Sequence, residues 1–223
     1  MMSAAGPALA TPLRVCMRDR IRETLVTRIL DGTYPTGTKL KELPLAREFN
    51  VSQAPIREAL RELEGSGLVS CERYRGTRVR GADIEELLES YELRAIMEIR
   101  SVELSVPYAA TALEEFGRCL REMATAVARG DRERYIDEAL RFHRGLVQGS
   151  GNRTFLRLWD SLHWEVRGRI ALRRIASQRH GLKPLLNLHK SLLARLRTRD
   201  VAGATRRLRE LFATVAAPTR PPA

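Results

Sequence analysis

The sequence contains few cysteines and no apolar segment of membrane-spanning length. Its three cysteines, Cys16, Cys71 and Cys119, lie far apart, and no two of them form a CxxC pair. This spacing excludes a zinc ribbon and a disulfide framework, and it favours reduced thiols in the cytoplasm. A run of about 18 apolar residues, the signature of a transmembrane helix, does not occur.

Both ends of the chain lack the pattern of a folded element. The start, MMSAAGPALATPL, has neither the basic stretch nor the apolar length of a signal peptide. The end, APTRPPA, contains three prolines, which exclude a continuing helix. We therefore expect disordered tails over residues 1–12 and 216–223.

Positive charge is what the chain has in excess. It carries 39 Lys and Arg against 27 Asp and Glu, a formal net charge of +12 over 223 residues. A hydrophobic content of 43% with 30% charged residues is typical of a globular protein. The length suits one large domain or two small ones, and the charge favours a polyanion as partner, either nucleic acid or an acidic membrane surface.

Residues 13–81 alternate between short helical patterns and turn signals. Apolar residues at helical spacing predict a helix over residues 14–30, and DGTYPTGTKL then forms a turn-rich connector. LPLAREF is long enough for two helical turns, and Asn50 suits a left-handed turn after it. The stretch LVSCERYRGTRVRG indicates two short strands around a turn. A third helix, described below, lies between LPLAREF and the two strands. The order of helix, helix, turn, helix and two strands predicts a winged helix-turn-helix.

The helix between these segments has two different faces. Ser52 is a good N-cap, Pro55 fits the first turn, and Gly67 ends the helix. Three long hydrogen-bond donors recur on one edge at a spacing of four, opposite an apolar stripe of Ile56, Leu60 and Leu63; the donors are Gln53, Arg57 and Arg61. Such an edge suits a recognition helix in the major groove. An ordinary solvated face with acidic partners is the alternative.

From Asp83 onward the sequence predicts only helices. Glycine, proline and polar breaks divide this part into six segments, roughly 83–106, 112–128, 131–148, 152–176, 184–198 and 200–215. A bundle of six or seven helices over residues 82–215 can bury its own core. The fold class is therefore mainly α, a winged helix-turn-helix domain followed by an all-α bundle.

The N-terminal part resembles the DNA-binding domain of GntR-family bacterial transcription regulators. The resemblance lies in LAREFNVSQAPIREALRELEGSGLV, with DGTYPTGTKL before it and YRGTRV after it. It implies a homodimer on a palindromic DNA operator, with the recognition helix in the major groove and the wing tip near the minor groove. The residues we expect at the DNA are Arg47, Ser52, Gln53, Ala54, Pro55, Arg57, Arg61, Arg75 and Gly76.

Two positions depart from the usual GntR pattern. Gln53 stands where an arginine is usual, and Ala54 stands where a hydroxyl residue is common. Because glutamine pairs well with adenine and arginine with guanine, Gln53 predicts a shifted base preference at that half-site position.

The helical part resembles the FCD ligand-binding domain of the FadR-type branch. The matching stretches are ELRAIMEIRSVELS, RFHRGLVQGSGNRTFLRL and LLNLHKSLLARLRTRDVAGATRRLRELF. Many such domains bind a divalent metal through one Asp and three His, and here those positions hold Ala139, His143, His189 and Leu211. Two histidines alone are weak metal candidates, because protein sites normally supply at least three ligands. We therefore expect that no cofactor is required, although a divalent metal stays possible.

The FCD resemblance also implies a small carboxylate effector. We expect His143 and His189 to line its pocket, and an interior arginine would suit a carboxylate through paired hydrogen bonds. Arg94 and Arg167 are the candidates, although Arg94 could instead pair with Glu98 four residues later.

These features predict a cytoplasmic transcriptional regulator whose operator affinity is controlled by an effector, and the resemblance favours a repressor. One alternative is a metal-dependent helical enzyme tethered to DNA. Since the chain has no nucleophile–base motif such as GxSxG or HExxH, we expect no enzyme. The other alternative is a non-specific nucleic-acid-binding protein, which an operator-selective complex would exclude.

Overall fold

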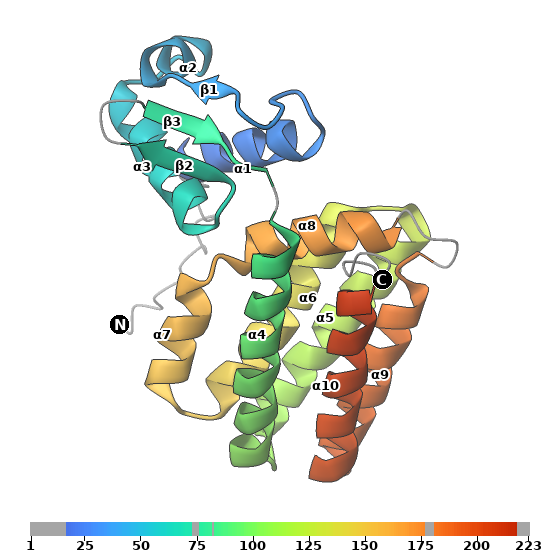
Figure 1. The fold of residues 1–223 in the computed structure, drawn as a ribbon. Helices are drawn as coiled ribbons and strands as arrows, with labels where there is room; N and C mark the ends of the chain where they lie inside the picture. Colours follow the sequence, from blue (N-terminus) through green and yellow to red (C-terminus); the bar gives the residue numbers. More distant parts are fainter. Residues whose placement is uncertain (1–16, 73–75, 82, 177–180, 218–223) are drawn as a thin grey trace, which may run out of the picture.

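The chain folds into a small N-terminal domain and a larger helical bundle. The computed structural model describes residues 17–72, 76–81, 83–176 and 181–217. Over these ranges it contains ten helices and three short strands, with the N-terminal domain at one end of the bundle (Figure 1). The fold is mainly α, as predicted. The expected tail at 1–12 lies outside these ranges, and the last helix includes Ala216, which the sequence had assigned to a tail.

The N-terminal domain is a winged helix-turn-helix. Its elements are α1 (Met17–Leu30), β1 (Lys39–Leu40), α2 (Glu42–Glu48), α3 (Gln53–Gly65), β2 (Val69–Glu72) and β3 (Gly76–Val79). The three strands form an antiparallel sheet in the order β1-β3-β2. The connector had not been expected to contain β1. A two-residue strand is too short to show alternating hydrophobicity, and its pairing with Arg78 and Thr77 depends on a distant segment.

The local signals around α3 explain its bounds. Asn50 adopts a left-handed conformation with φ of 52°, and Gly67 does the same with φ of 80° just beyond the C-cap Ser66. Ser52 is the N-cap, although its side chain makes no capping hydrogen bond. Ile56 and Leu63 are fully buried, so the apolar stripe packs α3 into its domain as expected.

The C-terminal bundle contains seven helices within the described residues. They are α4 (Ile84–Ser105), α5 (Ala110–Arg129), α6 (Arg132–Gly149), α7 (Arg153–Ser161), α8 (Trp164–Ala176), α9 (Lys183–Arg197) and α10 (Val201–Ala216). The segment predicted as one helix over residues 152–176 is two, because the backbone turns left-handed at His163 with φ of 49°. Figure 1 shows α8 crossing the end of the bundle that lies nearest to the N-terminal domain.

Side-chain caps fix where four bundle helices begin. The side chains of Asp83, Asp131, Asn152 and Asp200 each accept backbone N–H bonds in the first turn of α4, α6, α7 and α10. The core between the helices is apolar and aromatic, and Phe142, Leu146 and Leu192 in it are fully buried. No helix in the described ranges is both long enough and apolar enough to cross a membrane.

Candidate nucleic-acid interface and ligand cavity

The outer edge of α3 is exposed, as its sequence pattern predicts. Gln53, Arg57 and Arg61 all face solvent, while Ile56 and Leu60 on the opposite side are buried. The helix therefore separates a packing face from a polar face. A polar edge of this kind can reach base edges and phosphates in a DNA groove.

Arg57 is held by an acidic residue from α2. Its Nε donates to Oε1 of Glu42 at 3.0 Å and its Nη2 donates to Oε2 at 2.7 Å. The hydrogen bonds from Arg57 lower the pKa of the Glu42 carboxyl, and the same bonds raise the pKa of Arg57. Sequence reasoning identified Arg57 but missed Glu42, because 15 residues and a turn separate the two.

The other residues predicted at the DNA lie around this pair. The exposed members of the set are Arg47, Ser52, Gln53, Ala54, Arg57, Arg61 and Gly76. Pro55 is half-buried in the first turn of α3, and Arg75 lies outside the described residues. Within the part of the chain that the structure describes, Arg47 and Arg61 form no ion pair, so both cations can meet a phosphate.

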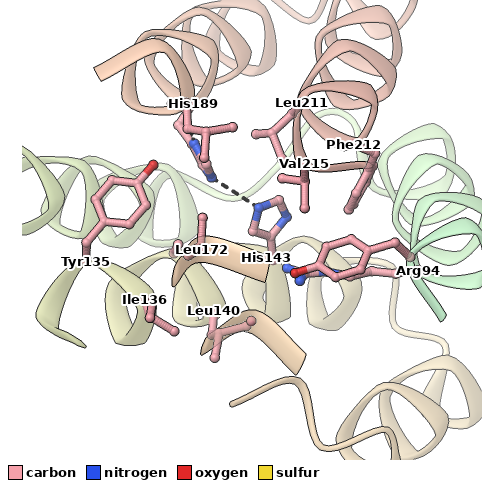
Figure 2. A pocket seen from close by; sticks show the side chains of 14 residues that line it. Arg94, Tyr135, Ile136, Leu140, His143, Leu172, His189, Leu211, Phe212 and Val215 are labelled. Atoms are coloured by element: carbon pink, nitrogen blue, oxygen red, sulfur yellow. Dashed lines mark hydrogen bonds between the residues drawn. The ribbon is translucent and has the colours of Figure 1, made fainter. Parts of the chain in front are cut away.

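A small cavity lies inside the bundle between α4, α6, α8, α9 and α10. Its volume is about 30 Å³, which is room for about two water molecules. Most of its wall is apolar. The side chains with polar groups that line it are Tyr91, Arg94, Tyr135, His143 and His189, and Figure 2 labels the last four. Ala139 and Leu211 also line it. The structure therefore brings together the four positions that the FCD resemblance assigns to metal ligands.

A chain of buried polar contacts runs along one side of the cavity. Arg94 Nε donates to Glu98 Oε1 at 2.7 Å, and Glu98 Oε2 lies 2.5 Å from His143 Nδ1. Nε2 of His143 then lies 3.1 Å from Nε2 of His189, the contact drawn in Figure 2. The chain ends where Nδ1 of His189 donates to the backbone oxygen of Leu185 at 2.7 Å. Arg94 thus has the ion-pair partner that the sequence offered as the alternative to an effector.

Burial sets the protonation of this cluster. It lowers the pKa of His143, and together with repulsion from His143 it lowers the pKa of His189 to about 3. Burial pushes the pKa of Glu98 upward, but the attraction of His143 and Arg94 outweighs it, and the pKa is lowered. The cluster therefore holds a carboxylate beside an arginine, and His189 is neutral near neutral pH.

Tyr135 supplies a hydrogen-bond donor that the other described residues leave unused. Its side chain is fully buried and lines the cavity, and burial raises the pKa of its phenol. Within the described residues its hydroxyl has no hydrogen-bond partner. An unpaired buried hydroxyl is costly, so a ligand or water that accepts from it gains a hydrogen bond.

The residues of this cavity do not fit the metal that the resemblance implies. The Nδ1 atoms of His143 and His189 are oriented by Glu98 and a backbone carbonyl, as in metal-bound histidines. However, Ala139 and Leu211 have no atom that can bind a metal. Within the described ranges no group of three or more His, Cys, Asp or Glu side chains could hold an ion.

Arg167 lies outside the cavity, at the junction of the two domains. Its guanidinium donates to Ser90 Oγ at 2.9 Å, to Glu86 Oε1 at 3.0 Å and to the backbone oxygen of Leu162 at 2.8 Å. The carboxylate of Glu86 in turn packs against Gly67 of the N-terminal domain, where an added Cβ would lie 3.0 Å from it. Arg167 was predicted to bind an effector, and in the structure it ties α8 to the start of α4.

Comparisons with known proteins agree with both halves of this architecture. Residues 17–79 match the family described as bacterial regulatory proteins, gntR family, and residues 89–214 match the FCD domain. A probable D-xylose utilization operon transcriptional repressor of Paenarthrobacter nicotinovorans is 31% identical over 153 residues, which cover 69% of this chain and 68% of that protein. A gluconate operon transcriptional repressor of Bacillus licheniformis is 28% identical over 185 residues, which cover 81% of this chain and 76% of that protein. The crystal structure of a putative transcriptional regulator GntR from Rhodococcus sp. RHA1 superposes with a TM-score of 0.71 at 23% identity. The match covers 91% of this chain and 96% of the Rhodococcus chain.

Proposed function

The chain belongs to the GntR family of DNA-binding transcriptional repressors with an FCD domain, and we propose that a small molecule bound in its bundle controls its affinity for a palindromic operator. The observation that carries the DNA-binding part is the exposed edge of α3, with Gln53 and Arg57 one turn apart above a buried apolar stripe. In this proposal the bundle contains the effector site, and the protein acts on DNA in the bacterial cytoplasm.

Selection of bound sequences from random duplex DNA tests this function. We expect a palindrome whose two halves are each read by one α3, and a complex that survives excess random DNA. Gln53→Arg is expected to change the preferred base at one position of each half-site, from adenine toward guanine. Binding without any selected motif would instead support a non-specific nucleic-acid-binding protein.

The effector site is the cavity between His143 and His189, and a small carboxylate is the class of effector that we propose. Arg94 is a cation in the cavity wall, and the hydroxyl of Tyr135, unpaired among the described residues, offers a donor there. Because the cavity has a volume of only about 30 Å³, an organic acid must move its walls to enter. This requirement is what would make binding change the conformation of the bundle.

Gluconate and D-xylose are the first probes, because they appear in the names of similar repressors. Gluconate is a carboxylate and D-xylose is neutral, so the pair also tests the proposed class. An effector should lower operator affinity about 5- to 150-fold and raise the melting temperature of the bundle. A response to D-xylose alone would contradict the carboxylate assignment.

Arg167 provides a physical route from the cavity to the DNA-binding domain. The next residue, Gly168, lines the cavity, while Arg167 itself binds Glu86 and Ser90 at the start of α4. A ligand that displaces α8 must therefore strain or break these bonds. The expected result is a changed separation of the two winged domains and a poorer fit to the two half-sites.

A homodimer is the assembly that a palindromic operator requires. An exposed apolar face on α4 supports a contact between two copies, since Leu93, Ile96 and Leu104 are 37%, 66% and 47% exposed. A two-fold axis near Ile96 would place the two copies of Ile96→Cys close enough to form a disulfide under mild oxidation. Failure to cross-link in a protein that is dimeric by light scattering would move the interface elsewhere.

We propose further that the site needs no metal and that the bundle catalyses no reaction. The proposal that no metal is needed is supported by the cavity, where only His143 and His189 of the four ligand positions hold a metal-binding side chain. The proposal that no reaction is catalysed is supported by the absence of a nucleophile–base motif from the sequence. Adding zinc, nickel or manganese should leave the melting temperature unchanged. A tightly bound ion would raise it by mass action and would contradict the proposal.

A further inference from the structure

We propose that Glu42 is a positioning residue that orients Arg57 so that the outer edge of its guanidinium reads one guanine in each operator half-site. The inference rests on the proposed function, because it requires a specific operator. It assigns a role to Glu42, and it assigns a base and a mode of contact to Arg57.

The geometry of the pair decides which N–H groups of Arg57 stay available. A guanidinium has five N–H donors in a fixed plane. The carboxylate of Glu42 accepts hydrogen bonds at the side edge of the guanidinium, from Nε to Oε1 at 3.0 Å and from Nη2 to Oε2 at 2.7 Å. Nη1 keeps both of its hydrogens and Nη2 keeps one, so the outer edge still presents two parallel N–H groups.

Those two parallel donors match one base edge in the major groove. Guanine presents two acceptors, O6 and N7, and arginine bonded to both is the commonest specific protein–DNA contact. Adenine presents one acceptor and one donor at the same positions, so the same edge of Arg57 would meet a like donor. The side-on contact with Glu42 therefore leaves Arg57 in the orientation that discriminates guanine.

Glu42 also reduces the cost of ordering Arg57 on binding. A free arginine side chain loses rotamer freedom when it docks, and this loss opposes binding. In the structure the side chain of Arg57 is 53% exposed and yet makes three hydrogen-bond contacts with one carboxylate. Part of the ordering is thus complete before DNA arrives.

The same carboxylate must weaken binding to DNA in general. Glu42 places a negative charge beside the edge of α3 that approaches phosphates, and the lowered pKa of its carboxyl keeps that charge in place. Positioning and charge repulsion therefore have opposite effects. The first raises the preference for the correct base, and the second lowers affinity for every sequence.

Arg61 shows the contrasting case on the same helix. It is exposed one turn beyond Arg57, and within the described part of the chain it forms no salt bridge with a carboxylate, although its charge helps to lower the pKa of Glu42. Its side chain is free to follow the nearest phosphate. We assign Arg61 to sequence-independent affinity and Arg57 to base discrimination.

The test compares four full-length proteins, the wild type, Glu42→Gln, Arg57→Lys and Glu58→Gln. Glu58 is the matched control, because it is an exposed acid on α3 that makes no ion pair among the described residues. Each protein is used to select sites from random duplex DNA. Its affinity is then measured on the selected site, on that site with the guanine replaced, and on random DNA.

We expect the wild type to select a guanine in each half-site that Arg57→Lys no longer selects, since lysine lacks two parallel donors. Glu42→Gln should bind random DNA more tightly, yet lose about 10-fold in its preference for that guanine. Glu58→Gln should also bind random DNA more tightly and keep the full preference. Thermal unfolding of all four confirms that each variant is folded.

Two outcomes would overturn the inference. If Glu42→Gln and Glu58→Gln behave alike, with affinity raised for every sequence and the preference intact, Glu42 acts through charge alone. If Arg57→Lys keeps the guanine, Arg57 does not read it. A wild type that selects no motif would instead refute the proposed function itself, and this is distinguishable because the variants then have no preference to lose.

Discussion

Each of the two domains contains an arginine–glutamate ion pair, and the two pairs differ in their exposure to solvent. Arg57 and Glu42 meet on the surface of the winged domain, with side chains 53% and 32% exposed, whereas Arg94 and Glu98 meet inside the bundle at 4% and 0%. An exposed pair adds little to stability, because water and salt screen it. A buried pair leaves an expensive unpaired charge when one partner is removed. The winged domain therefore offers charge to a partner, while the bundle confines charge around a cavity.

The distribution of histidine sharpens this comparison. All four histidines of the chain lie at residue 143 or beyond, so the winged domain has none. Two of them, His143 and His189, are 2% exposed beside the buried pair. Acid should consequently act on the bundle before it acts on the DNA-binding surface.

Removing Arg94 should have the largest effect on stability. Arg94→Ala leaves Glu98 ionised and without its cation in a fully buried position, which should lower the free energy of unfolding of the bundle by about 3–5 kcal/mol. The guanidinium also lies 4.9 Å from the ring centre of Trp164, so packing is lost as well. Urea unfolding followed by circular dichroism measures the change.

The surface pair is the matched control for that measurement. Glu42→Gln should leave the urea midpoint unchanged, because its partner Arg57 stays solvated. If the two variants lost equal stability, burial would not be what separates the two pairs. Replacing both buried partners by apolar residues, Arg94→Met with Glu98→Leu, should recover much of the loss.

Arg167→Ala should have an intermediate effect, because Arg167 belongs to neither environment. It is 6% exposed and binds Glu86, Ser90 and the Leu162 carbonyl, but Glu86 itself is 39% exposed. Loss of these bonds should cost on the order of 1–3 kcal/mol and loosen the contact between the domains. Calorimetry should then show two separated transitions. A single transition with an unchanged midpoint would rule out Arg167 as the connection.

The sequence predicts the surface site far better than the cavity, for a physical reason. Residues that contact DNA from one helix are set by local spacing, so Gln53, Arg57 and Arg61 could be placed on one edge without any tertiary knowledge. Even there, the partner of Arg57 was missed because Glu42 comes from another helix. The winged fold followed from helix and turn signals in the same way, apart from the two-residue strand β1.

The cavity depends on contacts between distant segments. Glu98 and His143 are separated by 45 residues, and His143 and His189 by 46, so no spacing rule could show that their side chains meet. The family resemblance supplied the convergence of His143 and His189, whereas the pairing of Arg94 with Glu98 was offered by their spacing of four residues on one helix. For the same reason, no spacing rule could show that Arg167 meets Glu86, which lies 81 residues before it.

Acidification should weaken the bundle selectively. The pKa of His189 is about 3 in the folded protein, whereas an unfolded histidine titrates near 6.5. Between these values the unfolded state binds more protons, so the free energy of unfolding falls as the pH falls, by up to about 1.4 kcal/mol per pH unit. His143, whose pKa is also lowered, acts in the same direction. Unfolding measured from pH 7 to 5 should show this slope, and His189→Gln should flatten it.

The rate of thiol labelling should show the smallest effect of these measurements, and it reports on each domain separately because each contains one of the two cysteines described by the structure. Cys71 in β2 is exposed, whereas Cys119 in α5 is fully buried and its pKa is raised to about 12 by burial. In a Cys16→Ser background at pH 8, a thiol reagent should label Cys71 in the native protein and reach Cys119 only when the bundle opens. Arg94→Ala should therefore speed the labelling of Cys119 and leave the labelling of Cys71 unchanged. Equal acceleration at both thiols would mean that the two domains unfold as one unit, and the contrast between a surface that binds and an interior that holds charge would not extend to their stability.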